Sequence, residues 1–173
     1  MIANYFVQFA GLSQIWFVVS PQNPFKVKDE LLDENKRLDL INLAIGNDER
    51  FKASQVEFEL PRPSYTINTL NYLAEAYPQF EFVPIIGGDN LQHFDKWKDY
   101  QLILNKYEVY VYRRAGFYEN PLLANHPKIK IFEVPLLNIS STYIREMIQA
   151  DKSIKYLVPE KVEAFIKQAG YYK

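Results

Sequence analysis

Apolar residues in the first part of the chain predict a helix followed by a buried strand. Ile2, Phe6 and Phe9 recur at helical spacing, and Gly11 can end that helix. The run QIWFVVSP at residues 14–21 is then almost continuously apolar, which is typical of a strand covered on both faces. We therefore expect a helix and then an inner strand at the start of the chain.

A second helix and a second strand are predicted after a polar loop. Asp33 can cap a helix that ends at Gly46, because aspartate accepts hydrogen bonds from the first amides and glycine tolerates the final turn. The inward-facing residues of this helix would be Leu38, Ile41 and Ile45. The segment VEFEL at residues 56–60 alternates apolar and polar positions, as a half-buried strand does.

The rest of the chain continues this alternation of helices and strands. A helix is predicted from about Tyr65 to Tyr77, with an inner stripe made of Ile67, Leu70 and Leu73. Further strands are predicted at residues 80–86, 107–114 and 129–134, and further helices at residues 90–104, 141–149 and 159–169. Pro84 weakens the first of these strands, because proline removes a backbone donor.

Strands that alternate with helices predict an α/β fold with a doubly wound, mostly parallel, Rossmann-like sheet. In such sheets ligands bind outside the carboxyl ends of the strands. Four polar segments directly follow strand-like runs, and these are SPQNPFK, GGDN, RRAG and NISST. The sequence therefore predicts one domain over residues 1–173 with a binding crevice at one edge of its sheet.

Composition and charge narrow the class of protein. With 173 residues, of which 48% are hydrophobic, the chain can bury the core of one domain. A formal net charge of −1 provides no broad positive field, so we expect no nucleic-acid polymer as a partner. The absence of cysteine excludes disulfides and thiolate zinc sites and agrees with a reducing, cytoplasmic location. The apolar N-terminus is interrupted by Asn4, Gln8, Ser13 and Gln14, and no lysine or arginine precedes Lys26, so neither a membrane-spanning helix nor a signal peptide is predicted.

The segment NISSTYIREM combines several groups that bind phosphate. A helix N-terminus offers unpaired amides and a positive dipole end, to which Ser140, Ser141 and Thr142 add hydroxyls and Arg145 adds a guanidinium. An ordinary N-cap hydroxyl and a solvated arginine are the simpler explanation of the same residues. The sequence pattern alone leaves both interpretations open.

Two other segments carry candidate binding residues with similar alternatives. In IIGGDN, Gly87 and Gly88 allow close approach of a ligand, and Asp89 can accept from a ribose, hold magnesium or simply cap a helix. Trp97 can stack on a flat base or belong to the core. Thr66, at the start of the PSYT helix, is either a capping residue or a polar contact.

The remaining charged and titratable side chains give little evidence of function by themselves. Lys26 follows a strand and can reach a phosphate as a point charge, although a solvated lysine is the simpler explanation. His93 and His126 stand apart from each other and from other metal ligands, so we predict no protein metal site and no nucleophilic triad.

Taken in order, these segments resemble the bacterial nicotinate-nucleotide adenylyltransferase family over essentially the whole chain. The matching segments are WFVVSPQNPFK, RPSYTINTL, IIGGDN, KW and ISSTYIRE. The resemblance implies transfer of AMP from ATP to nicotinate mononucleotide with Mg²⁺, giving nicotinate adenine dinucleotide and pyrophosphate in NAD biosynthesis. In this family the mononucleotide phosphate attacks the α-phosphorus directly, so alignment and charge stabilisation carry catalysis.

The resemblance also implies a role for each candidate residue. The ATP phosphates would be held by Ser140, Ser141, Thr142 and Arg145, and the adenosine ribose would contact Gly87, Gly88 and Asp89. Thr66 and Trp97 would line the nicotinate pocket, and Arg114, next to Arg113, would bind the mononucleotide. Arg145 and Lys26 would be the catalytic cations, and residues 141–173 would form a C-terminal helical part that binds phosphate.

One feature departs from the family. Its members begin with a strand that leads into an H-x-G-H motif, and this sequence, which opens on the helix that follows, has neither. From the resemblance we expect Met1 to match an internal position and the chain as given to be of low activity, since one such donor typically contributes ~3–4 kcal/mol. The missing strand would leave sheet edges unpaired, which favours association into a homo-oligomer. A related adenylyltransferase with another acceptor and a noncatalytic nucleotide-binding module remain the alternatives.

Overall fold

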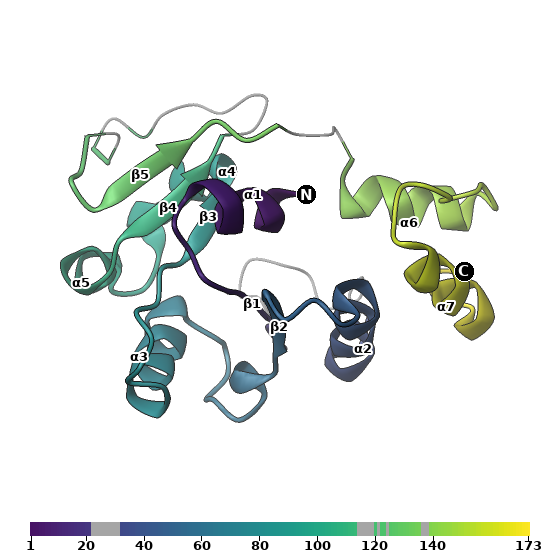
Figure 1. The fold of residues 1–173 in the computed structure, drawn as a ribbon, viewed down its shortest axis with the longest axis horizontal. Coiled ribbons are helices and arrows are strands. Elements are labelled where there is room, and N and C mark those ends of the chain that lie inside the picture. The colour runs from purple at the N-terminus through teal and green to yellow at the C-terminus, as the bar shows by residue number, and fades with distance from the viewer. Residues whose placement is uncertain (22–31, 114–119, 121, 124, 136–138) are drawn as a thin grey trace. The chain divides into compact units, whose positions relative to one another are not determined.

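The computed structural model describes residues 1–21, 32–113, 120, 122–123, 125–135 and 139–173. These residues form two compact units (Figure 1). The first unit contains Ala3–Glu59 and Leu137–Lys173, and the second contains Leu60–Leu136. Each unit is described by itself below.

The first unit contains a two-stranded parallel sheet. Its elements are α1 (Ile2–Phe9), β1 (Ile15–Val18), α2 (Glu34–Ile45), β2 (Phe51–Ser54), the 3-10 helix η2 (Val56–Phe58), α6 (Ser141–Gln149) and α7 (Glu160–Ala169). Ile15 lies opposite Phe51, and Val18 lies opposite Ser54. The helix and the strand predicted at the start of the chain are confirmed, with Phe6 fully buried and Phe9 exposed. The expected burial on both faces of the strand is wrong, because within β1 only Ile15 is buried and the other three residues are half-buried.

The strand predicted for VEFEL is wrong, because the strand of this region lies just before it. β2 ends at Ser54, whose carbonyl accepts from the amide of Val19 at 2.9 Å. The chain then turns, with the amide of Phe58 donating to the carbonyl of Gln55, and forms η2. Glu57 is the buried residue of that turn, so the apolar alternation did not mark an inward face.

Helix α2 has the predicted boundaries and packs on two sides. Asp33 Oδ1 accepts from the amides of Asn35 and Lys36, and the helix ends at Gly46, which has a φ of 61°. α2 contacts both β2 and α7. The predicted inward residues Leu38, Ile41 and Ile45 are each half-buried, because the helix divides its apolar surface between these two neighbours.

The last helices of the first unit share an apolar cluster, here called the C-terminal cluster. Its buried members are Ile148, Ile154, Val162 and Ile166, and its partly buried members are Leu40, Leu43, Ile144, Met147, Leu157, Val158, Tyr171 and Tyr172. The cluster thus joins α2, α6 and α7. Gly170, with a φ of 65°, ends α7 and turns the chain back, so that Tyr171 and Tyr172 lie against the cluster.

The second unit contains a three-stranded parallel sheet in the order β3-β4-β5 (Figure 1). Its elements are α3 (Thr66–Ala76), β3 (Ile85–Gly87), α4 (Gly88–Leu91), the 3-10 helix η3 (Phe94–Lys96), α5 (Tyr100–Lys106), β4 (Val109–Tyr112) and β5 (Ile129–Phe132). Gly87 lies opposite Tyr112, and Tyr112 lies opposite Phe132. β3 starts only after Pro84, which explains why it is shorter than the predicted segment.

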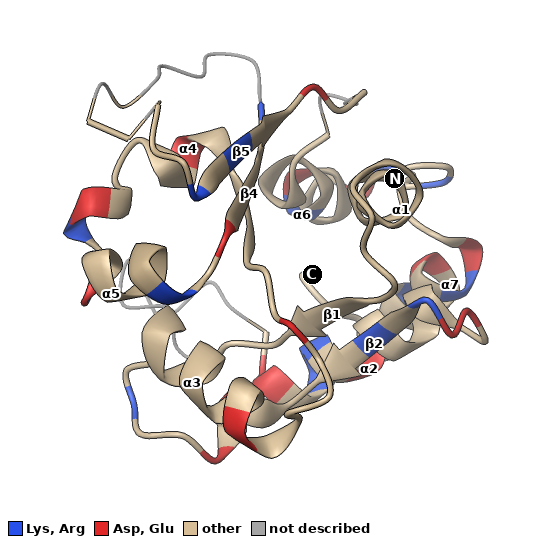
Figure 2. Ribbon diagram, turned by 60° about the vertical axis from the view of Figure 1, so that its left-hand side comes forward, with Lys and Arg blue, Asp and Glu red and all other residues tan. Residues whose placement is uncertain are grey.

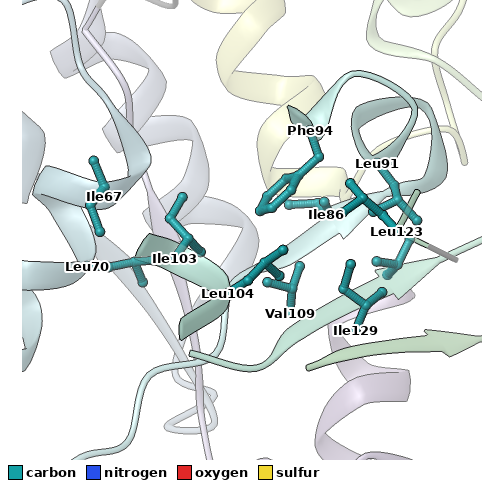
Figure 3. Close-up of a cluster of buried hydrophobic side chains, with 11 residues drawn as sticks. Ile67, Leu70, Ile86, Leu91, Phe94, Ile103, Leu104, Val109, Leu123 and Ile129 are labelled. Carbon is teal, nitrogen blue, oxygen red and sulfur yellow. The ribbon is translucent and has the colours of Figure 1, made fainter. Parts of the chain in front are cut away.

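Side chains from the helices and strands of the second unit meet in one apolar core. Figure 3 shows Phe94, Leu91 and Ile86 pointing toward residues of β4, β5 and α5. Phe94, Leu91, Ile103 and Val109 have no exposed surface. Burial of each such side chain contributes ~1.5–3 kcal/mol, so this core fixes the segment that connects β3 to α5.

The predicted α/β class with parallel strands is confirmed, because all three strand pairs are parallel and helices separate the strands in sequence. The strands form two sheets in the described residues. Basic and acidic positions are interspersed along the ribbon in Figure 2. No helix within the described ranges is long and apolar enough to cross a membrane.

Candidate active site

The first turn of α6 has the hydroxyl-rich arrangement that the sequence indicated. Ser140 is the N-cap residue, and its Oγ accepts from the amide of Tyr143 at 3.0 Å. The next two hydroxyl residues, Ser141 and Thr142, are exposed. One hydroxyl therefore serves the helix itself, while the two that follow remain accessible at its positive end.

Arg145 is turned toward this first turn. Its Nη2 donates to Oγ1 of Thr142 at 3.2 Å, one turn earlier on the same helix. On the other face of α6, Ile144, Met147 and Ile148 belong to the C-terminal cluster and anchor the helix. The first turn of α6 thus gathers two exposed hydroxyls and a half-buried guanidinium at a helix N-terminus, which is a suitable arrangement for an anion such as phosphate.

Arg37 is a charged residue that the sequence analysis missed. Its Nη2 donates to the carbonyl of Ser20 at 2.7 Å, and its Nε donates to the carbonyl of Leu32 at 2.9 Å. The side chain therefore links Ser20, two residues after the end of β1, to Leu32, the residue that precedes the α2 cap. Nothing in the local sequence marks this role, because Ser20 lies 17 residues away from Arg37 along the chain.

The two predicted basic residues on loops, Lys26 and Arg114, lie outside the described residues. Arg113, which directly precedes Arg114 in the sequence, lies within the described residues. Its amide donates to the carbonyl of Phe132, and its Nη1 lies 2.6 Å from Oε1 of Glu133. The charge of Arg113 is thus partly balanced by a carboxylate, which makes it a weaker anion ligand than an arginine without such a partner.

In the second unit, Gly87 is required by crowding. A Cβ atom at Gly87 would collide with Oδ1 of Asp89 and would lie 3.2 Å from the hydroxyl oxygen of Tyr112. Gly87 ends β3 and caps α4, while Asp89 lies in the first turn of α4, where a negative charge is favourable. The glycine thus lets the Asp89 carboxylate fold over the end of β3, and Asp89 is not the cap residue.

Trp97 and Thr66 lie at the boundaries of two helices of the second unit, Trp97 after η3 and Thr66 at the start of α3. Trp97 follows η3 and is half-buried, with its ring centroid 5.0 Å from that of Phe94. It therefore rests on the core of the unit. Thr66 is the first residue of α3, which has no side-chain hydrogen bond at its N-cap, Tyr65.

Asn120 is a second residue that the sequence analysis missed. It is buried, and its Nδ2 donates to the carbonyl of Gln92 at 3.4 Å and to Oδ1 of Asp95 at 3.3 Å. These bonds hold the segment between α4 and Trp97 in place. A buried amide that bonds to a segment 28 residues away in sequence has no local signature.

Metal-ligating side chains do not gather in the part of the chain that the structure describes. No group of three or more His, Asp or Glu residues lies close enough there to hold an ion. His126 has a local role instead, since its Nδ1 accepts from the amide of Lys128 at 3.2 Å.

The predicted residues fall into two described groups. Ser140, Ser141, Thr142 and Arg145 are brought together in the first unit, and Gly87, Gly88, Asp89, Thr66 and Trp97 belong to the second. The contacts described above for each group join residues of the same unit.

Comparison with known proteins places the chain in a family. The cytidylyltransferase-like family model matches residues 2–147. A probable nicotinate-nucleotide adenylyltransferase of Cytophaga hutchinsonii is 46% identical over 99% of this chain and 89% of the relative, and one of Flavobacterium johnsoniae is 45% identical over 100% and 90%. The fold is similar to that of Plasmodium falciparum nicotinic acid mononucleotide adenylyltransferase complexed with NaAD, with a TM-score of 0.79, 18% identity and coverage of 99% of this chain and 88% of that one. The chain therefore belongs to the cytidylyltransferase-like family and, within it, to the nicotinate-nucleotide adenylyltransferases.

Proposed function

We propose that this chain transfers AMP from ATP to nicotinate mononucleotide, giving nicotinate adenine dinucleotide and pyrophosphate. The observation that carries the proposal is the first turn of α6, where Arg145 is directed to the hydroxyl of the exposed Thr142 at a helix N-terminus. The names of the relatives from Cytophaga hutchinsonii and Flavobacterium johnsoniae support this assignment. The reaction is the step of NAD biosynthesis in which the dinucleotide is formed.

The reaction needs alignment and charge stabilisation more than covalent chemistry. A phosphate oxygen of the mononucleotide forms a bond to the α-phosphorus of ATP, while the bond from that phosphorus to the bridging oxygen breaks. Pyrophosphate leaves with the electron pair. Because negative charge builds up on the leaving group and on the α-phosphate oxygens, a fixed cation and oriented amides stabilise the transition state more than the ground state.

The α6 group is proposed to bind the phosphates of ATP. The amides of the first turn and the hydroxyls of Ser141 and Thr142 donate to phosphate oxygens, and Arg145 contributes a charge-assisted bond. Ser140 holds the helix start, so its contribution is to orient these donors. Lys26 is proposed as a second cation for the reacting phosphates.

The second group is proposed to recognise the nucleosides. Gly87, Gly88 and Asp89 contact the adenosine ribose, for which the exposed Asp89 carboxylate is a suitable acceptor. Trp97 is proposed to stack on the nicotinate ring, because it rests on Phe94 and can present a rigid surface. Thr66 and Arg114 complete the proposed mononucleotide contacts.

Magnesium is proposed as an ion that arrives with ATP. It prefers oxygen ligands and keeps several waters, and phosphate oxygens satisfy this preference without a protein cluster. When bound, the ion would neutralise phosphate charge.

The test is adenylyl transfer by the purified protein, followed as pyrophosphate release with ATP, Mg²⁺ and nicotinate mononucleotide. Nicotinamide mononucleotide and pantetheine phosphate serve as competing acceptors, and calorimetry with ATP alone measures nucleotide binding. Transfer to nicotinate mononucleotide in preference to the other two supports the proposal. Preference for another acceptor would assign a different adenylyltransferase. Failure both to bind ATP and to transfer AMP to any acceptor would contradict the proposal.

A further inference from the structure

Asn120 is a buried polar residue between β4 and β5 that has no part in the reaction described above. The residue is 8% exposed, so little water can replace the bonds that its side chain makes. Nδ2 donates to the carbonyl of Gln92 at 3.4 Å and to Oδ1 of Asp95 at 3.3 Å. Oδ1 accepts from the amide of Leu122 at 3.1 Å. The oxygen thus serves the local turn, while the nitrogen reaches a distant part of the chain.

The two acceptors of Asn120 lie on either side of the break between α4 and η3. Gln92 directly follows α4, and Asp95 lies within η3. A backbone carbonyl at the end of a helix has no partner within that helix, so a side-chain donor from elsewhere stabilises the break. The amide of Asn120 therefore holds the end of one short helix and the middle of the next at the same time.

Asn120 is itself anchored in the second unit. The amide of Leu123 donates to the carbonyl of Asn120 at 3.0 Å. The side chain of Leu123 is buried and belongs to the same apolar core as Leu91 and Phe94 (Figure 3). The turn that begins at Asn120 is thus fixed by apolar packing, which gives its side chain a firm base from which to hold the α4–η3 break.

Trp97 directly follows the segment that Asn120 holds. The amide of Trp97 donates to the carbonyl of Phe94 at 3.0 Å, and this bond closes the turn that contains Asp95. The ring centroids of Trp97 and Phe94 are 5.0 Å apart. Packing on Phe94 supports one side of the indole, whereas the bond from Asn120 to Asp95 restrains the backbone that carries it. A shift of η3 would therefore shift the indole as well.

We infer that Asn120 is a positioning residue of the mononucleotide site, which fixes Trp97 by fastening the break between α4 and η3. Stacking depends on the distance and the angle between two rings, so a tryptophan held in one place binds a flat ring at a lower entropy cost than a mobile one. This inference rests on the proposed function, because it takes Trp97 as the surface on which the nicotinate ring stacks.

The experiment removes the donors of Asn120 without changing the shape of its side chain. Asn120→Asp keeps the acceptor for the amide of Leu122 but places an oxygen against the two acceptors that Nδ2 now serves. We expect the Kd for nicotinate mononucleotide, measured by calorimetry, to rise roughly two- to tenfold, the range that one aromatic stacking contact covers. The Kd for inorganic tripolyphosphate, which probes the proposed α6 group, should stay unchanged.

Asn71→Asp is the matched control, because it makes the same chemical change elsewhere in the second unit. Oδ1 of Asn71 accepts from Nζ of Lys106 at 3.2 Å and from the hydroxyl of Tyr107 at 3.4 Å. A carboxylate can accept both of these bonds. Asn71→Asp should therefore bind nicotinate mononucleotide like the unsubstituted protein.

The fluorescence of Trp97 reports on its position independently of any ligand. The chain has two tryptophans, so in a Trp16→Phe background the indole emission comes from Trp97 alone. Asn120→Asp should shift this emission to longer wavelength and increase its quenching by acrylamide, because the indole would be held less firmly against the core. Asn71→Asp should leave both properties unchanged.

A double variant tests the partner of Asn120. Asn120→Asp combined with Asp95→Asn reverses the direction of the bond, so that the amide at position 95 donates to the carboxylate at position 120. This variant should recover part of the mononucleotide affinity and of the emission, since the bond to the Gln92 carbonyl is still lost. If Asn120→Asp does not fold, Asp95→Ala removes one acceptor only, and it should raise the Kd by a smaller factor than Asn120→Asp would.

The outcomes separate this inference from the proposed function. Equal mononucleotide binding by Asn120→Asp and Asn71→Asp, unchanged Trp97 emission, or a double variant that recovers nothing would each overturn the inference and leave the proposed function intact. A parallel loss of tripolyphosphate binding would show that Asn120 acts on overall stability alone, which also overturns it. Failure of the unsubstituted protein to bind nicotinate mononucleotide would overturn the proposed function and the mononucleotide site with it.

Discussion

Nη2 of Arg145 lies 3.2 Å from Oγ1 of Thr142, so the guanidinium is directed along α6 toward its first turn. An arginine at this position that pointed into solvent would contribute only a mobile charge. The bond to Thr142 limits the rotamers of the side chain and keeps its charge at the positive end of the helix. This arrangement lowers the entropy cost of binding a phosphate.

Replacement of Arg145 by alanine should weaken ATP binding strongly. A charge-assisted hydrogen bond contributes about 1.5–3 kcal/mol, so we expect the Kd for ATP to rise roughly 10- to 100-fold. Arg145→Lys should give an intermediate loss, because lysine keeps the charge but lacks the planar fork. Calorimetry measures the ATP affinity of both variants. The control is Lys152→Ala, because Lys152 is an exposed lysine beyond the end of α6. Equal ATP affinity in Arg145→Ala and Lys152→Ala would contradict the assignment.

A side chain at Gly87 should destabilise the second unit. In Gly87→Ala the new methyl group meets Oδ1 of Asp89 and approaches the Tyr112 hydroxyl, and overpacking of this kind costs about 1–3 kcal/mol. Urea unfolding measures the loss.

The double variant Gly87→Ala with Asp89→Ala separates the two neighbours. Removal of the carboxylate should recover part of the lost stability, because only the Tyr112 contact would remain. If Gly87→Ala costs the same with and without Asp89, the collision with the carboxylate does not explain the glycine.

Trp97 should contribute to binding of the mononucleotide and not of ATP. Trp97→Phe preserves a ring against Phe94 but presents a smaller surface, and aromatic pairs contribute about 0.5–1.5 kcal/mol, so we expect a two- to tenfold rise in the Kd for nicotinate mononucleotide. Trp16→Phe on β1 is the matched control. The proposed stacking is disproved if Trp97→Phe leaves nicotinate mononucleotide binding unchanged.

The ion pair between Glu108 and Lys130 should make stability depend on pH in the acid range. The two residues lie just before β4 and within β5, with Oε2 and Nζ 2.8 Å apart. The hydrogen bond from Lys130 lowers the pKa of Glu108 below its ordinary value. The unfolded chain therefore binds this proton more readily than the folded one, so the stabilisation is present above the unfolded pKa and is lost as the pH falls through the lower, folded pKa.

Glu108→Gln tests this expectation by urea unfolding at several pH values. The variant should be less stable than the unsubstituted protein near neutral pH, and the difference should shrink as the pH falls below about 4 and as salt is added. Glu75→Gln, an exposed glutamate of α3, is the control. A stability difference that stays constant down to low pH would show that the ion pair does not contribute in this way.

Much of the fold was predictable because its signals are local. Asp33 and Gly46 mark the ends of α2, and Ser140 marks the start of α6, since each of these residues satisfies or terminates the backbone of its own helix. The β2 strand was misplaced because its position depends on pairing with β1, which lies 36 residues earlier in the register of Ile15 and Phe51. Apolar alternation in VEFEL carried no information about that partner.

Some features of the candidate site were likewise predictable from the sequence, and others were visible only in the structure. The types and order of its residues, from Gly87 to Arg145, are a property of the sequence and led to the family that the comparisons show. The structure alone revealed that Asp89 folds over Gly87, that Arg37 bonds to Ser20 and Leu32, and that Tyr172 packs against the C-terminal cluster. The sequence by itself thus determined the local elements and the chemical inventory, because caps, periodicity and side-chain types act over a few residues. The tertiary structure decided which distant groups meet, because those contacts depend on how whole elements pack.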